Sequence, residues 1–317
     1  MCAKRILITG AAGLIGSHIL LRLTNQDDYL VRAVDFGKEL RIRGKNISFV
    51  SADLSRMEQC KEVVKEIDFA IMFAAKIDRR PKNLSFAIAN LTMNFQMMEA
   101  AYEAGVKKIV WLSSATGYPP LDRPAKEEEM FLGDPCNSNF AVGWMNRYLE
   151  IMCKMYATKL ERKMSTIVFR PTAVYGEYGD FNPATCHVLP ALVCKVAKRQ
   201  NPLEIWGSGD TLRDFIYAGD VAAACLLAIN RIEGHDVFNL GSGEAISIKE
   251  LSALLIEIDH YFNAQIVYRG GDAKPAQSIQ VNMKKAKDIL GFSPRVSIRE
   301  GLSKVLAWYK EQEIVNV

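Results

Sequence analysis

The sequence lacks the cysteine spacing of a disulfide framework or of a zinc site. Its seven cysteines are odd in number and scattered, and no two of them are separated as C-x-x-C. This distribution favours reduced thiols in a cytoplasmic protein over structural disulfides. We therefore predict neither a disulfide scaffold nor a bound metal.

Long apolar runs and a strong excess of one charge are also absent. No run of about 18 apolar residues occurs, so we predict no membrane-spanning helix. The 40 Lys and Arg residues exceed the 36 Asp and Glu residues by only four. Such a small excess gives no reason to expect nucleic acid or a membrane surface as a partner. No secretory hydrophobic region precedes the first predicted strand, so we expect a cytoplasmic location.

The sequence does contain a regular alternation of short apolar runs and helical stretches. We predict strands near residues 5–9, 29–35, 47–50, 68–73, 107–114 and 164–170. Helical periodicity lies between them, over residues 14–24, 56–66, 85–104 and 140–161. This alternation predicts βαβ units, and hence an α/β fold with a doubly wound parallel sheet of the Rossmann type.

Beyond residue 170 the alternation becomes less regular. Gly, Pro, Asn and Tyr crowd the segment RPTAVYGEYGDFNPAT, which indicates a loop. Shorter elements follow, with helices over 187–199 and from 221, and strands in LEIWG and QIVYRG. We predict a nucleotide-binding core over residues 1–170. A smaller substrate-binding lobe should occupy residues 171–317, with some of its segments returning to the core.

Three glycines separate the first predicted strand from the first helix. Gly10, Gly13 and Gly16 lie in the segment GAAGLIG, which also contains Leu14 and Ile15. Glycine allows a tight turn and a close approach of the backbone to a pyrophosphate, which the N–H groups at a helix N-terminus bind. The position between a strand and a helix indicates a dinucleotide site.

An acidic residue at the end of the second strand indicates which dinucleotide is bound. Asp35 follows Gly16 by 19 residues, close to the spacing of a ribose-binding acid. Its carboxylate would accept hydrogen bonds from the ribose hydroxyls and repel a 2′-phosphate. We therefore predict NAD, while Lys38 and Arg41 keep NADP open as an alternative.

The glycine spacing resembles that of the extended short-chain dehydrogenase/reductases that act on nucleotide sugars. The segment Ser113-Ser114-Ala115-Thr116 is similar to the family's active-site serine segment. The segments RPTAVYG, HVLPAL and IWGSG, followed by RDF, resemble the nicotinamide loop and the nucleotide-sugar half, most of all in GDP-fucose synthases. The resemblance covers essentially the whole chain.

This resemblance implies a set of binding residues and a homodimer. Beyond the glycine loop and Asp35, the implied cofactor contacts are Phe36, Asp53, Leu54, Ala74, Ala75, Asn94, Ser113, Asn146, Pro171, Thr172 and Val174. The implied contacts to a nucleotide-sugar substrate are His187, Val188, Lys195, Trp206 and Arg213. Relatives pair through two long helices, and the apolar positions here are Phe86, Met93, Met97, Tyr148 and Met152.

Several of the substrate positions also have a simpler interpretation. Arg213 would hold the diphosphate with its planar guanidinium, or else form a surface salt bridge with Asp210 or Asp214. Trp206 would pack near the base or belong to the core. His187 would contact the hexose, donate a proton, or only pack at a helix start.

The family's base is missing from this sequence. Its members oxidise a hydroxyl with a serine and a Tyr-x-x-x-Lys pair, in which the lysine lowers the pKa of the phenol. The best alignment puts Val142 in place of the tyrosine and Asn146 in place of the lysine. A shift by two residues puts Phe140 and Trp144 there instead, so neither alignment restores the pair.

Two hypotheses follow from this absence. In the first, the chain is an oxidoreductase that oxidises C4 of a nucleotide-linked hexose or heptose to the 4-keto sugar. It would use Ser114 and Thr116, with Tyr118, His187 or a water as base. An epimerase or reductase with a different acid/base is a variant of this hypothesis. In the second, the chain is a catalytically retired protein that binds NAD and a nucleotide sugar.

Overall fold

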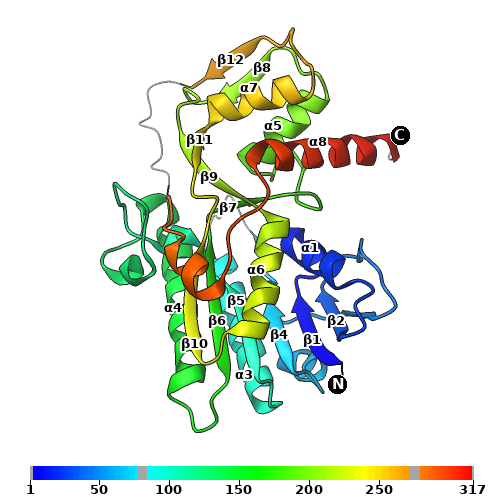
Figure 1. The fold of residues 1–317 in the computed structure, drawn as a ribbon, viewed down its shortest axis with the longest axis vertical. Coiled ribbons are helices and arrows are strands. Elements are labelled where there is room, and N and C mark those ends of the chain that lie inside the picture. The colour runs from blue at the N-terminus through cyan, green and yellow to red at the C-terminus, as the bar shows by residue number, and fades with distance from the viewer. Residues whose placement is uncertain (1–2, 78–83, 271–278, 316–317) are drawn as a thin grey trace.

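The computed structural model describes residues 3–77, 84–270 and 279–315. A seven-stranded parallel sheet forms its centre, in the order β10-β6-β5-β4-β1-β2-β3 (Figure 1). The strands are β1 (Lys4–Thr9), β2 (Tyr29–Asp35), β3 (Ile47–Ser51), β4 (Phe69–Met72), β5 (Lys108–Leu112), β6 (Ser165–Pro171) and β10 (His235–Leu240). This arrangement confirms the predicted Rossmann-type sheet.

Helices cover both faces of this sheet. They are α1 (Leu14–Leu23), α2 (Met57–Val63), α3 (Ser85–Glu103), α4 (Phe140–Thr158) and α6 (Ala218–Arg231). Because strand side chains alternate between faces, Ile6 and Ile8 of β1 pack in the cluster that includes α1 and α6. Leu7 between them packs in the cluster with α2, α3 and α4. All three side chains are fully buried, which explains the continuous apolar run.

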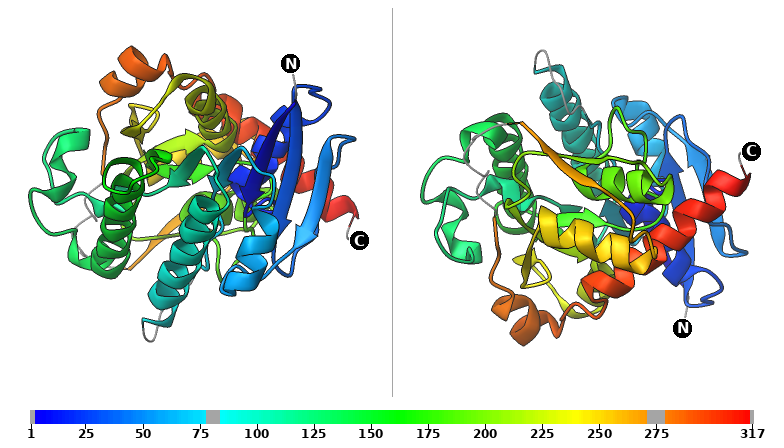
Figure 2. Two further views of the ribbon diagram at one scale, coloured as in Figure 1. Left: turned by 90° about the horizontal axis from the view of Figure 1, so that it is seen from below. Right: turned by 90° about the horizontal axis from the view of Figure 1, so that it is seen from above.

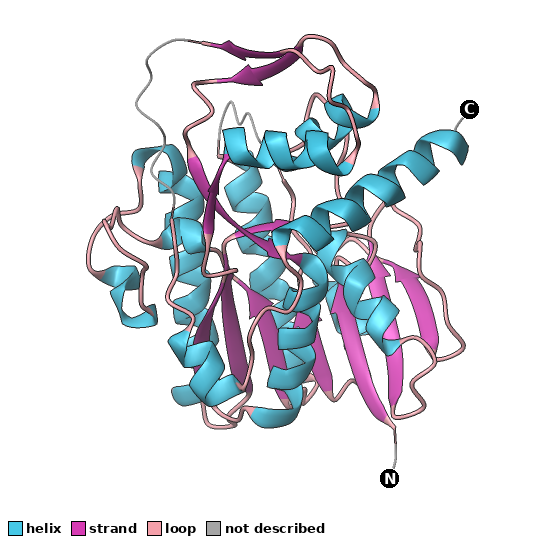
Figure 3. Ribbon diagram, turned by 45° about the horizontal axis from the view of Figure 1, so that its top comes forward, coloured by secondary structure: helices cyan, strands magenta, loops and turns pink. Residues whose placement is uncertain are grey.

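The lobe stands over the edge at which the core strands end (Figures 1 and 3). Its elements are β7 (Ala173–Tyr175), α5 (Val188–Ala197), β8 (Leu203–Trp206), β9 (Leu212–Tyr217), β11 (Ala245–Ser247), α7 (Ile248–Ile258), β12 (Ile266–Arg269) and α8 (Ile298–Val315). They form a three-stranded sheet, β11-β9-β7, and a two-stranded one, β12-β8. In the chain between β9 and β11, α6 and β10 return to the core, where β10 pairs with β6.

Several predicted helix boundaries differ from the structure, and two of them show the physical reason. The helix predicted over 140–161 ends at Thr158, where the chain turns back and the Met164 N–H donates to the carbonyl of Tyr156. The helix predicted from residue 221 already begins at Ala218. Asp220 in its first turn is buried and accepts two backbone N–H groups from residues 295 and 296, a long-range contact that no local pattern reveals.

The residues predicted for a dimer interface are only partly exposed. Phe86 and Met97 lie inside the chain, with 5% and 1% of their surface exposed, so for these two the prediction is wrong. Tyr148 is half exposed, and Met93 and Met152 are partly buried. Periodicity identifies an apolar helix face but does not tell whether it meets the sheet or solvent.

All the cysteines that the structure describes are free thiols, and burial raises the pKa of Cys60 to about 11. Cys2 lies outside the described residues. Within the described ranges, no group of three His, Cys, Asp or Glu side chains is placed to hold a metal ion. Among the same residues, no helix is long and apolar enough to cross a membrane.

Candidate active site

Two positions of the loop after β1, Gly10 and Gly16, have room for glycine only. At Gly10, where φ is +69°, a Cβ would lie 2.8 Å from the carbonyl carbon and oxygen of Phe73. At Gly16 a Cβ would lie 2.2 Å from the carbonyl oxygen of Gly10. Gly13 caps α1 without a side-chain hydrogen bond, so the N–H groups of the first turn, including those of Leu14 and Ile15, point to the loop. This cradle fits a pyrophosphate at the helix N-terminus.

The carboxylate of Asp35 is fixed beside this loop. Its Oδ2 accepts the N–H of Ala12 at 2.9 Å, and its Oδ1 accepts the N–H of Phe36 at 2.8 Å. The side chain of Phe36 is 67% exposed next to it. Both carboxylate oxygens keep lone pairs for the two ribose hydroxyls of NAD, so the residues present fit this cofactor.

Asp53 and Leu54 follow β3 at the same edge of the sheet. The Oδ1 of Asp53 accepts the N–H and the hydroxyl of Ser55, and these hydrogen bonds lower the pKa of the Asp53 carboxyl. Leu54 is buried in the core, with 4% of its surface exposed. A contact from Leu54 to the cofactor would therefore use its backbone and not its side chain.

The loop after β4 is tied to the end of β1. The N–H of Ala74 donates to Oγ1 of Thr9 at 3.2 Å, and the next residue, Ala75, is exposed. Asn94 on α3 is used inside the protein: its Oδ1 accepts the indole N–H of Trp111 at 2.8 Å, and its amide donates to a carbonyl one turn earlier. We therefore do not keep Asn94 among the proposed cofactor contacts.

A buried ion pair supports the end of β5. The hydroxyl of Ser113 donates a hydrogen bond to the Glu150 carboxylate on α4. The same carboxylate binds Arg170 at the end of β6, with Nε–Oε1 at 3.0 Å, and both side chains are 3% exposed. This network holds α4 against β5 and β6. The sequence interpretation missed it, because a Glu in a helix usually marks a solvated face.

Tyr118 belongs to the same network. Its hydroxyl donates a hydrogen bond to Oδ1 of Asn239 at 2.7 Å and accepts a hydrogen bond from the Arg170 guanidinium at 2.8 Å. The residue is fully buried, and burial raises the pKa of its phenol. A phenol that is enclosed and harder to ionise cannot take a proton from a substrate, so the prediction of Tyr118 as an alternative base is wrong.

Ser114 and Thr116 form a pair of hydroxyl groups after β5. Oγ1 of Thr116 donates to Oγ of Ser114 at 2.9 Å, and the Thr116 N–H donates to the same oxygen at 3.2 Å. Both residues are half-buried. With its oxygen accepting twice, Ser114 keeps its own proton for a bound oxygen.

Helix α4 packs directly on this turn. A Cβ at Gly143 would lie 3.0 Å from the Thr116 carbonyl oxygen, and Nε of Arg147 donates to the carbonyl of Gly117 at 2.9 Å. The first turns of α4, which include Val142, therefore lie beside the serine segment.

The residues of the two possible alignments of α4 differ in burial. Phe140 and Trp144 are 47% and 41% exposed, with their rings 6.5 Å apart. Val142 is half-buried, and Asn146 is buried with 6% of its surface exposed. In the part of the chain that the structure describes, the Asn146 amide has no hydrogen-bond partner. The alignment in which Val142 and Asn146 replace the tyrosine and the lysine stays a prediction, and a buried Asn146 is compatible with it.

The segment after β6 joins the core to the lobe. Pro171 is the buried last residue of β6, and the Thr172 N–H donates to the carbonyl of Leu240 in β10 at 2.8 Å. Val174 follows in β7 and is half-buried. The loop predicted beside the nicotinamide is thus fixed at both of its ends.

The substrate residues predicted in the lobe lie on three of its elements. His187 is the N-cap of α5, and His187 and Val188 are both exposed. Nζ of Lys195 donates to the carbonyl of Glu204 in β8 at 2.6 Å. Trp206 at the end of β8 is 78% exposed, so its interpretation as a core residue is wrong.

Arg213 in β9 is half-buried, and burial lowers the pKa of its guanidinium. Within the described residues it forms no ion pair, which leaves the salt bridge with Asp210 or Asp214 unsupported. The Asp214 carboxylate instead accepts the N–H and the hydroxyl of Ser242, at 2.8 and 2.7 Å. A partly buried guanidinium without a carboxylate partner suits an anionic ligand.

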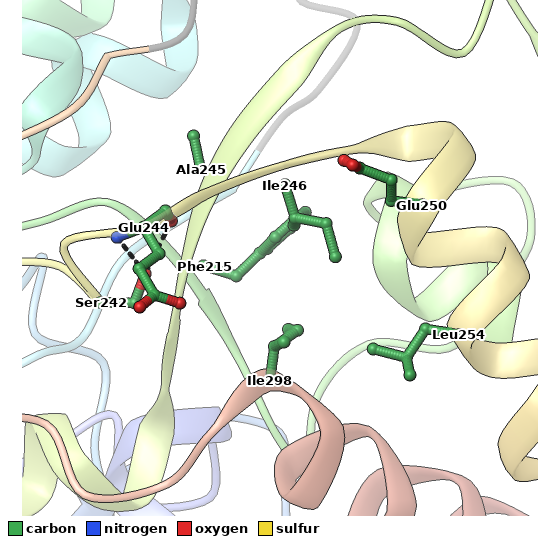
Figure 4. Close-up of a pocket in the computed structure, with 8 residues that line it drawn as sticks. All are labelled: Phe215, Ser242, Glu244, Ala245, Ile246, Glu250, Leu254 and Ile298. Carbon is green, nitrogen blue, oxygen red and sulfur yellow. Dashed lines mark hydrogen bonds between the residues drawn. The ribbon is translucent and has the colours of Figure 1, made fainter.

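A cavity of about 340 Å³ lies on the same strand (Figure 4). Phe215, two residues after Arg213, and Ile246, which faces Arg213 in β11, are among its apolar lining residues. The carboxylates of Glu244 and Glu250 also line it. Two carboxylates would repel a diphosphate, so we do not place the substrate phosphates in this cavity.

Comparison with known proteins identifies the group to which this arrangement belongs. The sequence pattern of the NAD dependent epimerase/dehydratase family matches residues 6–241, which include the glycine loop, the serine segment and Arg213. The chain belongs to this family. It is an NAD-dependent enzyme of nucleotide-sugar chemistry.

Individual relatives differ in the nucleotide that they use. GDP-L-fucose synthase 1 of Arabidopsis thaliana is 30% identical over 321 residues, which cover 97% of this chain and 93% of the relative. The structure of UDP-glucose 4-epimerase from Thermotoga maritima with UDP-glucose has a TM-score of 0.86 at 25% identity, covering 98% of this chain and all of that one. MoeE5 in complex with UDP-glucose and NAD has a TM-score of 0.81 at 27% identity, with the same coverage.

Proposed function

We propose that this protein oxidises C4 of a nucleotide-linked hexose or heptose to the 4-keto sugar, with NAD as oxidant and without a tyrosine base. The observation that carries the proposal is a contrast between two parts of the site: α4 has no tyrosine and lysine at the proposed positions, whereas the serine segment and the glycine loop are present. Gly143 and Arg147 of α4 contact the serine segment, and Val142 and Asn146 directly precede them in the helix, beside an intact Ser114–Thr116 pair and glycine loop. Oxidation of one hydroxyl needs less acid/base apparatus than an epimerisation followed by a reduction.

Bound NAD would supply the acceptor for the hydride that leaves C4. The glycine loop would hold its pyrophosphate, and Asp35 would accept hydrogen bonds from its adenosine ribose. The amide of Asn146, which has no hydrogen-bond partner among the described residues, would hydrogen-bond the nicotinamide ribose. This retains the binding role of the missing lysine without its charge.

Ser114 would donate a hydrogen bond to the sugar oxygen and stabilise the negative charge that develops there, while keeping its own proton. Thr116 orients it by donating to its oxygen at 2.9 Å. Neither hydroxyl is a base, so the hydroxyl proton of the sugar would pass to a water. Loss of a positioned general base typically costs about 10²–10⁴ in rate, so we expect slow turnover.

Arg213 would bind the diphosphate, with His187, Val188 and Trp206 around the rest of the substrate. Relatives that name GDP and relatives that name UDP both align with this chain over nearly its whole length. The substrate class is therefore a nucleoside-diphosphate sugar, and GDP is our first choice on the strength of the fucose synthases.

A screen of nucleotide sugars tests the proposal. Excess protein is mixed with NAD and a GDP-, dTDP-, UDP- or CDP-sugar in single turnover, and NADH is followed at 340 nm. Formation of NADH with one of these sugars is the expected result. Binding of a sugar nucleotide without any bound or free NADH would favour the retired binding protein, for which the missing pair argues.

We also propose a homodimer through α3 and α4, which lie side by side (Figure 2, left). Phe95 of α3 meets Tyr148 of α4 edge to face at 5.6 Å. A stripe of exposed apolar side chains continues from there along α4, with Tyr148, Ile151 and Met155 each at least 41% exposed. A monomeric mass by light scattering at micromolar concentration would contradict the dimer.

A further inference from the structure

The loop between β2 and β3 carries cations close to Asp35. Leu40 anchors it, because this side chain is only 9% exposed and packs in the core. One of the cations, Arg43, lies 3.9 Å from Glu39. Arg41 follows the anchored residue directly and is exposed. An arginine six residues after the ribose-binding acid would be a natural partner for a 2′-phosphate.

In the structure, the side chain of Arg41 contacts the lobe. Its guanidinium lies 5.7 Å from the centre of the Trp308 ring, on α8 of the lobe. That ring is fixed by edge contacts to Tyr178 at 5.6 Å and by packing on Phe181 at 5.4 Å. In the view from above in Figure 2, α8 lies over the N-terminal part of the core.

The effect of Arg41 on the pKa of Tyr178 agrees with a guanidinium that is turned toward Trp308. Burial raises the pKa of the Tyr178 phenol, and the positive charge of Arg41 partly opposes that rise. The guanidinium therefore acts on the aromatic cluster around Trp308. A side chain that is turned toward the lobe is not available at the carboxylate of Asp35.

We propose that Trp308 is a cofactor-specificity residue: by holding Arg41 on its ring, it withholds from the cofactor site the cation that would bind a 2′-phosphate. The inference rests on the proposed cofactor site around Asp35. NAD is then preferred for two reasons, because Asp35 repels the phosphate and because Arg41 is withheld from it. Asp35 and Arg41 belong to the core, whereas Trp308 lies on α8 of the lobe.

The two effects should not be additive. Removing Asp35 alone ends the repulsion but leaves Arg41 on the Trp308 ring, and the nearby Lys38 is the same in every variant. Removing the Trp308 ring alone frees a cation that the Asp35 carboxylate itself attracts. Only the double change offers a free guanidinium to the phosphate. The inference therefore predicts that the effects of changing Asp35 and Trp308 on NADP affinity are not additive.

The experiment measures dissociation constants for NAD and NADP by calorimetry in Asp35→Ala, Trp308→Leu and the double variant. Leucine keeps an apolar contact and removes the ring. The double variant should bind NADP about fivefold more tightly than Asp35→Ala, the factor that corresponds to a cation–π contact of about 1 kcal/mol. Adding Arg41→Ala to the double variant should abolish this gain.

Two results would overturn the inference: no gain in NADP affinity in the double variant, or a gain that persists without Arg41. If Trp308→Leu does not fold, Trp308→Phe replaces it under the same criteria, with a smaller expected gain because phenylalanine binds cations more weakly. The cofactor site itself has a separate readout. If Asp35→Ala leaves NAD affinity unchanged, the site fails, and the inference fails with it.

Discussion

The cofactor side and the reaction side of this site differ in what they retain. At the cofactor side, the glycines, the free N–H groups of α1 and Asp35 are all in place, and each is tied to its neighbours by backbone contacts. At the reaction side, the serine segment is in place, but α4 has Val142 and Asn146 at the positions where we propose that the tyrosine and the lysine of the family would lie. Binding a dinucleotide depends mainly on backbone shape, whereas proton transfer depends on two particular side chains.

The contacts that position α4 at the reaction side are separate from the side chains that would transfer a proton there. The buried pair of Glu150 and Arg170 still holds α4 against β5 and β6, and Ser113 still joins it. None of these contacts involves Val142 or Asn146. The contacts that hold α4 in place therefore do not depend on the side chains at positions 142 and 146.

The largest effect should follow from filling the cofactor loop. In Gly16→Ala the new Cβ would lie 2.2 Å from the carbonyl oxygen of Gly10, so the loop must open. We expect NAD affinity to fall about a hundredfold, which corresponds to about 3 kcal/mol of overpacking. Calorimetry measures it, and Gly13→Ala is the matched control, since its Cβ would lie 3.1 Å from the same oxygen. Equal losses in both variants would contradict the steric argument.

On the reaction side, Ser114→Ala should reduce single-turnover NADH formation by about 10²-fold and leave NAD affinity unchanged. Thr116→Val should cost less, because Thr116 acts by orienting Ser114. Stopped-flow absorbance at 340 nm measures both rates. If the serine variant kept the full rate while NAD binding fell, the serine segment would belong to the cofactor side of the comparison.

Restoring the pair should make the reaction side resemble that of other family members. Val142→Tyr with Asn146→Lys should increase the rate about tenfold, a part of the range of about 10²–10⁴ that a general base contributes. Phe140 and Trp144 face solvent, so they leave room for the phenol. Neither change alone should suffice, because the lysine lowers the pKa of the phenol. A rise of the rate with pH should appear only in the double variant.

The sequence could predict the sheet and the cofactor loop because their signals are local. The apolar run of β1 and the glycines after it need no knowledge of distant residues. The roles of Tyr118 and Asn94 could not be predicted in this way. Tyr118 is bound to Asn239, which lies 121 positions away in the sequence, and Asn94 to Trp111 on a neighbouring strand. A polar residue in an active-site motif looks available until its partners are known.

The smallest effect concerns the substrate phosphates. It tests whether the lobe, like the cofactor side, keeps a working binding site, here for the diphosphate. Arg213 is half-buried without a carboxylate partner among the described residues, so its planar fork is free to bind two phosphate oxygens. In Arg213→Lys a point charge remains, but the bidentate geometry is lost. We expect the KM for the nucleotide sugar to rise about fivefold, or about 1 kcal/mol, with NAD affinity unchanged. Lys195→Arg is a matched control: Lys195 already donates to the backbone of β8, so its replacement should change KM less. An unchanged KM in Arg213→Lys would show that this arginine only packs in the lobe, and the phosphates would then have to be bound elsewhere.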